Sequence, residues 1–588
     1  MQKRLLGIIA SIAVISAACG GASTSSAPAA SQPAGSAPAG SAPAGSPAAS
    51  GSGGASGAPS GATASGPIDA SGVLHVSLGS EDPDTLDPSK ASTSTDISVL
   101  HALGRGLLYL DKDLNVVPAL ATDMPTVSSD GLTYTFKLKD AKYSNGDPII
   151  AGDIVYAWQR LIDPRLATYY QQFLEPVKGA AEILKLNGTK ASDATIDAAL
   201  AKLGVAAPDD KTFILTLAHP SSYILDIVAL WGTAPMQKKW ITSPNPTEAA
   251  NFVSSGPFIM KSWTHQAEIV LAPNPNWYGT KPGVSEIDFK IGGAPAADQA
   301  TFEAGQLDDL AASPPDVPRI KADATLGPMV TTTPVLVFDY WGFNGKSGPT
   351  TNVHFRRALS MAIDKETMLQ TVYGGQGLVA DSPIPPGMPG HQDVGIGIKY
   401  DVAGAKTELA QALTELGIAD VTKLPPLSFG FNTNAGHELP AAFMQDQWRR
   451  NLGVQTSLVG ETFAQFVPDR LAGKFTITRD AWGSDYPHPD DFLRALFGTG
   501  SNNNDENYSN KAFDALIAQA GAEPDQTKSI ALYNQAQELL VQDAPAVFTR
   551  WRVANYEIAP YVTGITGTVQ DSVFYGDTFP ETIAITQH

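Results

Sequence analysis

Two stretches of this 588-residue chain carry residues that could bind a phosphate or a metal ion, and neither completes its motif. Gly-Lys-Ser at 345–347 matches the end of a phosphate-binding P-loop, but Tyr340 stands where the first glycine is needed. The acidic run at 111–115 provides the opening ligands of a calcium loop, whose glycine and closing glutamate are replaced by Val116 and Thr122. We expect a plain loop at 345–347 and a hairpin turn at 111–115.

Motifs of known enzymes are missing from the rest of the sequence. The chain contains neither the His-Glu-x-x-His of zinc proteases nor the Gly-x-Ser-x-Gly of serine hydrolases. Its single cysteine, Cys19, allows neither a thiolate zinc cluster nor a disulfide within the chain. The nine histidines are scattered and could form a site only in space. We therefore expect neither an enzyme nor a bound cofactor or metal, and keep a cell-surface hydrolase as the alternative.

Cys19 lies directly after a hydrophobic leader. Two basic residues precede an apolar run at 5–18 that is too short to span a bilayer, which predicts a signal peptide over 1–18. The sequence Ser-Ala-Ala-Cys-Gly resembles the lipobox of bacterial lipoproteins, although Ser16 stands where that family prefers leucine. The resemblance implies that the Cys19 sulfur carries a lipid and tethers the protein outside the cytoplasmic membrane. A buried free thiol is the alternative.

Composition divides the chain at about residue 66. Between Cys19 and that point the chain is rich in Ala, Gly, Ser and Pro and has no aromatic or charged residue, so 19–66 is expected to be a disordered linker. The rest is long enough for two or three lobes. The net charge of −20 argues against nucleic acid and anionic lipid surfaces as partners.

The sequence after the linker alternates strand and helix patterns. Alternating apolar residues predict strands at 73–78 and 132–138, and apolar residues at helical spacing predict a helix over 151–162. Further amphipathic helices are expected at 355–368, 438–452, 511–519 and 529–541. Strands and helices mixed along the whole length indicate an α/β or mixed α+β architecture.

A series of motifs in fixed order resembles the bacterial extracellular solute-binding proteins of the peptide/nickel family (family 5). The resemblance is strongest to the oligopeptide-binding lipoproteins of ABC importers. The matching blocks lie at 85–88, 118–121, 130–138, 143–148, 151–160, 256–258, 273–278, 353–364, 447–454 and 482–493. Any one block could arise by chance, but the ordered set is specific to the family.

The resemblance implies a type II periplasmic-binding-protein fold, in which two lobes close over a ligand like a Venus flytrap. The first lobe would comprise 67–95, 220–340 and 551–588, and the second lobe 341–550. An extra domain at 96–219 would be inserted in the first lobe. A peptide would pair its backbone with strand edges in the cleft, and its side chains would enter hydrated pockets.

The family pattern also assigns roles to particular residues. Asp485, in Trp-Gly-Ser-Asp-Tyr-Pro, aligns with the aspartate that holds the α-ammonium group of the peptide, and a turn aspartate is the structural alternative. Arg479, Arg470 and His437 align with residues that meet ligand C-termini, with surface ion pairs or a loop histidine as the alternatives.

Three further residues are assigned to the cleft by the same resemblance. Tyr170 and Trp482 align with walls of the cleft, and core packing is the alternative for both. Glu81 aligns near a strand that contacts the ligand, but this chain has an extra residue between Glu81 and the Leu-Asp-Pro motif at 86–88, which departs from the family spacing.

The class of ligand stays open between three possibilities. A carboxylate at Asp485 with a guanidinium at Arg479 favours a ligand with a free amine and a carboxylate, such as a peptide. An oligosaccharide remains an alternative, supported by Asn432, Asn434, Trp341 and Trp482, and a nickel or other metal chelate is a further alternative. We expect a monomer that passes its ligand to the permease and ATPase of an ABC importer, outside the cytoplasm.

Overall fold

The computed structural model describes residues 66–166, 168–392, 395–433, 436–501 and 503–588. These belong to one compact unit, residues 59–588. The predicted signal peptide, the lipidation site at Cys19 and nearly all of the linker lie outside the described residues. In the part of the chain that is described, no helix combines the length and the apolar character needed to cross a membrane.

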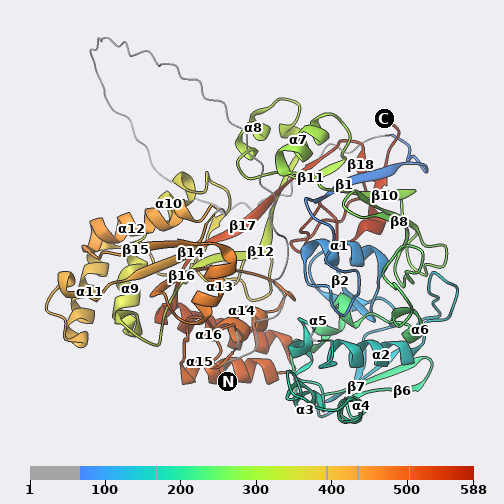
Figure 1. Cartoon of the computed structure of the whole chain (residues 1–588), viewed down its shortest axis with the longest axis horizontal. Coiled ribbons are helices and arrows are strands. Elements are labelled where there is room, and N and C mark those ends of the chain that lie inside the picture. The colour runs from blue at the N-terminus through green and yellow to red at the C-terminus, as the bar shows by residue number, and fades with distance from the viewer. Residues whose placement is uncertain (1–65, 167, 393–394, 434–435, 502) are drawn as a thin grey trace, which may run out of the picture. The chain divides into compact units, whose positions relative to one another are not determined.

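Eleven of the described strands form one mixed sheet, at whose centre two long strands pair antiparallel (Figure 1). These are β12 (Val330–Phe343) and β17 (Ala546–Ile558). Next to β17 follow β11 (Asp309–Ala311), β1 (Val73–Gly79), β10 (Glu286–Ile291), β9 (Glu268–Pro273) and β8 (Phe258–Thr264). Next to β12 follow β16 (Ile477–Gly483), β14 (Ser428–Asn432) and β15 (Ser457–Glu461), while β13 (Leu378–Val379) pairs with β17. The two long strands therefore join two groups of strands.

The first group of strands shares a core with helix α1 (Ser94–Leu103). Leu74 and Val76 of β1 are fully buried, as alternation along the strand predicts. Thr93 caps α1 by accepting a hydrogen bond from the amide of Asp96, at 3.2 Å. Short elements around this core are α6 (Lys238–Ile241), α7 (Pro295–Glu303), α8 (Val317–Ala322), β18 (Val562–Thr563) and β19 (Ala584–Ile585).

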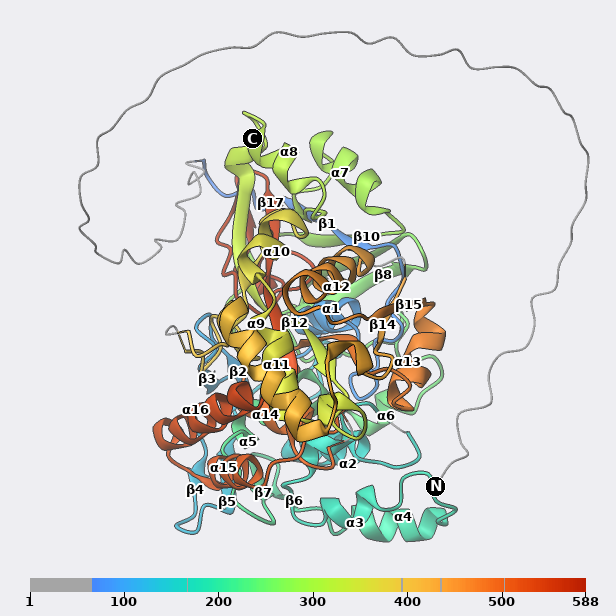
Figure 2. The same ribbon diagram turned by 90° about the vertical axis from the view of Figure 1, so that its left-hand side faces the viewer.

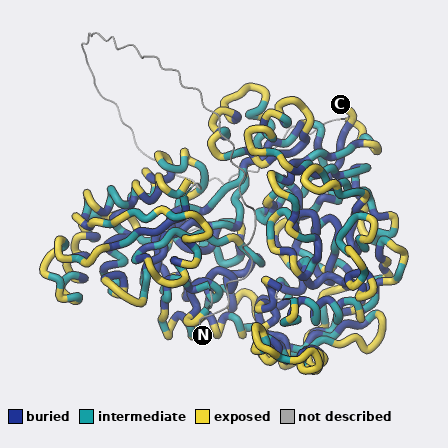
Figure 3. Tube along the Cα trace, viewed as in Figure 1, coloured by how far each residue is buried: buried dark blue, intermediate teal, exposed yellow. Residues whose placement is uncertain are grey.

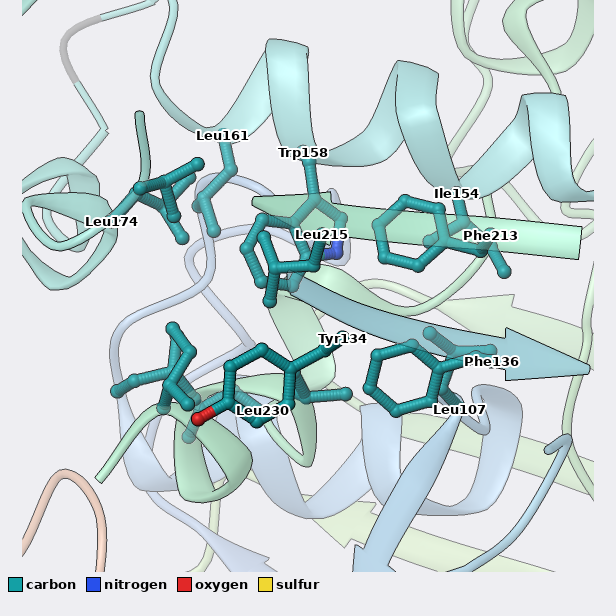
Figure 4. Packing of buried hydrophobic residues seen from close by; sticks show 14 of the residues in the cluster. Leu107, Tyr134, Phe136, Ile154, Trp158, Leu161, Leu174, Phe213, Leu215 and Leu230 are labelled. Atoms are coloured by element: carbon teal, nitrogen blue, oxygen red, sulfur yellow. The ribbon is translucent and has the colours of Figure 1, made fainter. Parts of the chain in front are cut away.

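A separate antiparallel sheet carries the inserted domain. Its strands, in spatial order, are β4 (Thr126–Val127), β5 (Thr133–Lys137), β7 (Thr212–Thr216) and β6 (Val205–Asp209). Figure 4 shows Trp158 of α2 (Ala151–Leu161) pointing toward this sheet beside Leu215, and its ring lies 5.9 Å from that of Phe213. Truncating such a buried tryptophan to alanine costs about 3–5 kcal/mol.

Two of the sequence motifs meet where the inserted domain joins the first lobe. Arg160 of α2 donates two hydrogen bonds to the carboxylate of Asp87, at 2.5 and 2.6 Å. Planar guanidinium and carboxylate groups pair most strongly in this bidentate geometry. The remaining short elements here are β2 (Leu108–Leu110), β3 (Val116–Pro118), α3 (Ala180–Leu184), α4 (Asp193–Leu200) and α5 (Ile224–Val228). The predicted hairpin turn at 111–115 is confirmed between β2 and β3.

Helices cover the strands of the second lobe. They are α9 (Val353–Met361), α10 (Lys365–Thr371), α11 (Val402–Leu416), α12 (Glu438–Leu452), α13 (Phe463–Leu471), α14 (Pro489–Phe497), α15 (Lys511–Ala522) and α16 (Gln526–Asp543). Helices α15 and α16 pack side by side, as Figure 2 also shows. Ala405, Leu409 and Ala412 of α11 are buried at helical spacing. Figure 3 shows that buried stretches lie inside the molecule and exposed stretches at its edge.

The predicted helices exist, with one correction. The single helix expected over 355–368 is wrong, because the chain forms α9 and α10 instead. Asp364 separates them: its side chain accepts a hydrogen bond from the amide of Thr367 at 3.0 Å and so caps a new helix. The loop predicted at 345–347 is confirmed directly after β12.

The expected lobe limits fall inside regular elements. Residues 340 and 550 lie within β12 and β17, so both lobes share these two strands. The expected start of the inserted domain, residue 96, lies within α1, whose apolar residues pack against the first group of strands. The apolar cluster around β5 and β7 includes residues beyond 219, up to Leu230, and also Tyr486.

Candidate ligand-binding site

Two cavities of about 580 Å³ each adjoin β12, β16 and β17. They meet at four shared lining residues, Pro314, Gln376, Arg550 and Arg552. We call the first the carboxylate cavity, after Asp226, Asp485 and Asp571 in its lining. We call the second the arginine cavity, because Arg479 joins the two shared arginines in its lining.

Asp485 in the carboxylate cavity meets a residue of the inserted domain. It follows the end of β16, so the strand fixes the start of its loop. The hydroxyl of Tyr170 donates a hydrogen bond to Asp485 Oδ1 at 3.3 Å. The Tyr170 ring in turn packs edge-on against Trp231, with 5.2 Å between ring centroids. Two residues that the sequence predicted for the cleft are thus in direct contact.

A second carboxylate, which is fully buried, is hydrogen-bonded to the backbone of Asp485. Asp491 of α14 accepts hydrogen bonds from the amide of Asp485 at 2.9 Å and from Trp482 Nε1 at 3.3 Å. Trp482 packs with the core of the second lobe and does not line either cavity. Trp482 is therefore in contact with Asp491 and lies outside the lining of both cavities.

Burial makes both carboxyl groups unusually weak acids. It raises the pKa of Asp485 to about 7, although the hydrogen bond from Tyr170 acts in the opposite direction. Burial, together with the nearby charge of Asp485, raises the pKa of Asp491 well above its usual range. Among the described residues, no cation pairs with either group. A cationic group entering this cavity would find a carboxylate without a counter-charge.

Asp339 organises the arginine cavity. It lies on β12 opposite Arg550 of β17, and it accepts hydrogen bonds from Arg550 Nη2 at 2.6 Å and Arg552 Nη2 at 2.5 Å. Burial alone would raise the pKa of Asp339, but the charges of Arg552 and Arg550 lower it to about 2. Because Arg550 and Arg552 are two residues apart, the strand directs both side chains to the same face.

Arg479 brings a third guanidinium group to the arginine cavity but no further carboxylate to pair with it. Its Nη2 lies 4.0 Å from Asp339 Oδ1, and the described residues offer it no hydrogen bond. Its side chain is only 16% exposed. His437 lines the same cavity, and burial together with the charge of Arg479 lowers the pKa of His437 to about 4. Three guanidinium groups thus surround the carboxylate of Asp339, beside a neutral imidazole. The other carboxylate in this lining, Asp480, is paired with Arg470.

The other two predicted residues lie outside both cavities. Arg470 forms ion pairs with Asp480 and, at 3.0 Å, with Asp505. Glu81 is exposed and does not line either cavity. Four further charged residues line the cavities and were not predicted from the sequence: Asp226, Asp339, Arg550 and Arg552. A signal existed for Asp339, because it is the only charged residue in the apolar run 335–343.

Comparison with known proteins identifies the family. The profile of the bacterial extracellular solute-binding proteins, family 5 Middle, matches residues 115–504. The chain belongs to this family. The family consists of solute-binding proteins. The similar solved structures confirm the expected mixed α/β, two-lobed type II fold.

Individual family 5 proteins resemble the chain over most of its length. The oligopeptide-binding protein OppA of Bacillus subtilis is 30% identical over 489 residues, which cover 80% of this chain and 86% of OppA. The unliganded open form of the murein tripeptide-binding protein MppA superposes with a TM-score of 0.74 at 26% identity, covering 89% of this chain and 99% of MppA. Haemophilus influenzae OppA in complex with the peptide RPPGFSPFR gives 0.70 at 25% identity, covering 89% and 100%.

Proposed function

We propose that the protein captures extracellular peptides, and oligopeptides in particular, without converting them. The observation that carries this proposal is the charge of the two connected cavities. One offers carboxylates without a cation, and the other offers guanidinium groups in excess of carboxylates. A ligand with an ammonium group at one end and a carboxylate at the other would match the charges of both cavities. The peptides in the names of OppA and MppA support the same ligand class.

Asp485 holds the α-ammonium group of the peptide in this proposal. An ammonium group leaves water only if a buried partner replaces its hydration. Among the described residues, Tyr170 alone donates to the carboxylate of Asp485, which can accept further hydrogen bonds. Tyr170 orients Asp485, while Trp482 and Asp491 fix the loop that carries it. The ionised form of Asp485 is stabilised when the ammonium arrives.

Arg479 receives a carboxylate of the ligand at the other end. A buried guanidinium without hydrogen bonds gains most from a bidentate anion. Neutral His437 can donate or accept one further hydrogen bond there. A neutral sugar would leave the arginine excess unpaired, which disfavours an oligosaccharide. An anionic metal chelate would satisfy the arginines but leave Asp485 without its cation.

The protein delivers its ligand to the permease and ATPase of an ABC importer and acts as a monomer anchored by lipid at Cys19. The leader at 1–18 and the lipobox-like sequence support this extracytoplasmic placement. Replacing Cys19 with serine is expected to release the protein into the medium or to leave an unprocessed precursor. A processed Cys19→Ser protein that stays on the membrane would contradict the anchor.

Two measurements test peptide capture directly. Native mass spectrometry of the purified protein should reveal a retained peptide. Calorimetry should then give clear binding of free-amine pentapeptides and much weaker binding of their N-acetylated forms, with no cleavage product on chromatography. Equal affinity for both forms would rule out the α-ammonium site and favour a chelate or sugar. Cleavage that is lost on mutating the cavity would favour the hydrolase.

A further inference from the structure

More acidic side chains line the carboxylate cavity than one α-ammonium group requires. Asp226, Asp485 and Asp571 all line it. Asp571 is satisfied by its own loop, where it accepts hydrogen bonds from the amides of Thr568 at 2.7 Å and Gly576 at 2.8 Å and from the hydroxyl of Thr578 at 2.8 Å. Asp571 therefore organises the loop, and it has little capacity left for a ligand.

Asp226 differs from Asp571 in having no such partners. It lies on the short helix α5, and no described side chain donates a hydrogen bond to its carboxylate or forms an ion pair with it. Burial raises the pKa of Asp226 to about 7. Asp226 is half-buried and lines the cavity, so a cationic group in the cavity could pair with its carboxylate.

The cations that line this cavity are already committed elsewhere. Arg550 and Arg552 both bind Asp339. His101 is neutral, because burial together with the charge of Arg105 lowers its pKa to about 4. Among the described residues, Asp226 and Asp485 therefore have no cationic partner, but a peptide has only one α-ammonium group.

The walls beside Asp226 suit an aliphatic side chain with a charged end. Ile97 of α1 and Ala229 and Leu230 after α5 line the same cavity, together with the ring of Trp231. A lysine or arginine side chain buries its methylene groups on such surfaces while its charge is paired. The described residues contain no group of three or more His, Cys, Asp or Glu side chains that could hold a metal ion, which favours an organic cation.

We propose that Asp226 binds a cationic side chain, lysine or arginine, close to the amino terminus of the bound peptide, so that the protein selects basic peptides. The inference rests on the proposed peptide-binding function, since Asp485 must take the α-ammonium group. The placement near the amino terminus follows because Asp226 and Asp485 line one cavity.

A charge scan along the peptide tests this proposal. Alanine pentapeptides carry either lysine or norleucine at each position in turn, so that each pair differs in charge but little in shape. Calorimetry with the full-length protein should give wild type a preference for lysine of about tenfold to hundredfold at one of the first three positions. Asp226→Asn should reduce that preference to less than about threefold and should bind the norleucine peptides at least as well as wild type.

A matched variant and a second substitution make the outcome clear. Asp123→Asn makes the same chemical change at an exposed aspartate outside both cavities and should keep the full lysine preference. Asp226→Ser replaces Asp226→Asn if the latter melts at a markedly lower temperature. Wild-type protein that does not distinguish lysine from norleucine, or an Asp226 variant that keeps the preference, overturns the proposal. Failure of wild type to bind any peptide would instead overturn peptide capture itself.

Discussion

The carboxylate and arginine cavities meet at Arg550 and Arg552, yet they handle charge in opposite ways. In the carboxylate cavity, Asp485 and Asp226 have no cation, and burial shifts both toward the neutral acid. In the arginine cavity, the charges are permanent, because guanidinium groups do not deprotonate in proteins. Without a ligand, the carboxyl groups at one end of the site can therefore be neutral, whereas the guanidinium groups at the other end stay charged.

The two cavities also differ in the elements that build them. Asp339, Arg479, Arg550 and Arg552 lie on three adjacent strands of one sheet, which fixes their spacing. The carboxylate cavity combines the loop after β16 with Tyr170 and Asp226 of the inserted-domain core region. Relative movement of these parts would alter the carboxylate cavity more than the arginine cavity.

The strongest test of the carboxylate cavity is Asp485→Asn. If Asp485 pairs with the α-ammonium group, its loss leaves a buried charge without a partner, which costs about 3–5 kcal/mol. Calorimetry should show affinity for a free-amine peptide falling by about two to three and a half orders of magnitude.

N-acetylated peptides are the control for Asp485→Asn. They should bind wild type and variant with similarly low affinity, because they lack the ammonium group. A loss of the same size for acetylated and free-amine peptides would show that the substitution damages the fold and not a charge pair.

Arg470→Gln should affect the free energy of unfolding and not the affinity, which separates structural from ligand-facing arginines. Arg470 pairs with Asp480 and Asp505, and Glu506 beside them is buried without a hydrogen-bond partner among the described residues. Removing the guanidinium from this partly buried network should cost up to about 3 kcal/mol. Urea denaturation measures the loss, and peptide affinity should stay within about threefold. Reduced affinity at unchanged stability would instead place Arg470 at the ligand.

Much of the fold follows from local patterns in the sequence. The helix expected at 438–452 coincides with α12, because its apolar spacing and its end before Gly453 agree. The helix expected at 355–368 divides because the capping side chain of Asp364 outweighs the continuous apolar pattern. Local periodicity contains no information on which distant strands pair, so the central position of β12 and β17 could not be derived from it.

The candidate site was predictable only in part for the same reason. The resemblance to the family predicted Asp485, Tyr170 and Arg479 at the ligand, and these residues do line the cavities. Asp339 and Arg552 come together only through pairing of strands far apart in the chain, and no local pattern records that contact. Glu81 and Arg470 were expected at the ligand, but in the structure they lie outside the lining of both cavities.

Arg479→Gln tests whether the arginine cavity binds the terminal carboxylate of the peptide. Wild type should prefer a peptide with a free terminal carboxylate over its C-terminal amide by about tenfold to hundredfold, since hydrogen bonds to charged groups contribute about 1.5–3 kcal/mol. The variant should lower this ratio to about threefold or less. Arg450→Gln, at an exposed arginine of α12, is the matched control and should leave the ratio unchanged. An unchanged ratio in Arg479→Gln would assign the carboxylate to Arg550 or Arg552.

The most gradual effect is a pH dependence of the carboxylate end of the site. The pKa of Asp485 is about 7 in the free protein against an ordinary value of 3.8, so the folded protein holds a proton that the unfolded chain releases. Stability of the free protein from this group should therefore fall as pH rises through that interval. Peptide binding requires the ionised form and should release the proton, so affinity should rise by up to about tenfold per pH unit between about pH 5 and pH 7. Calorimetry in buffers of different ionisation enthalpy measures the released proton. Asp485→Asn should remove the contribution of Asp485 to both trends, while Asp226, whose pKa is also about 7, keeps its own. A wild-type affinity independent of pH would contradict a titrating carboxylate at this end.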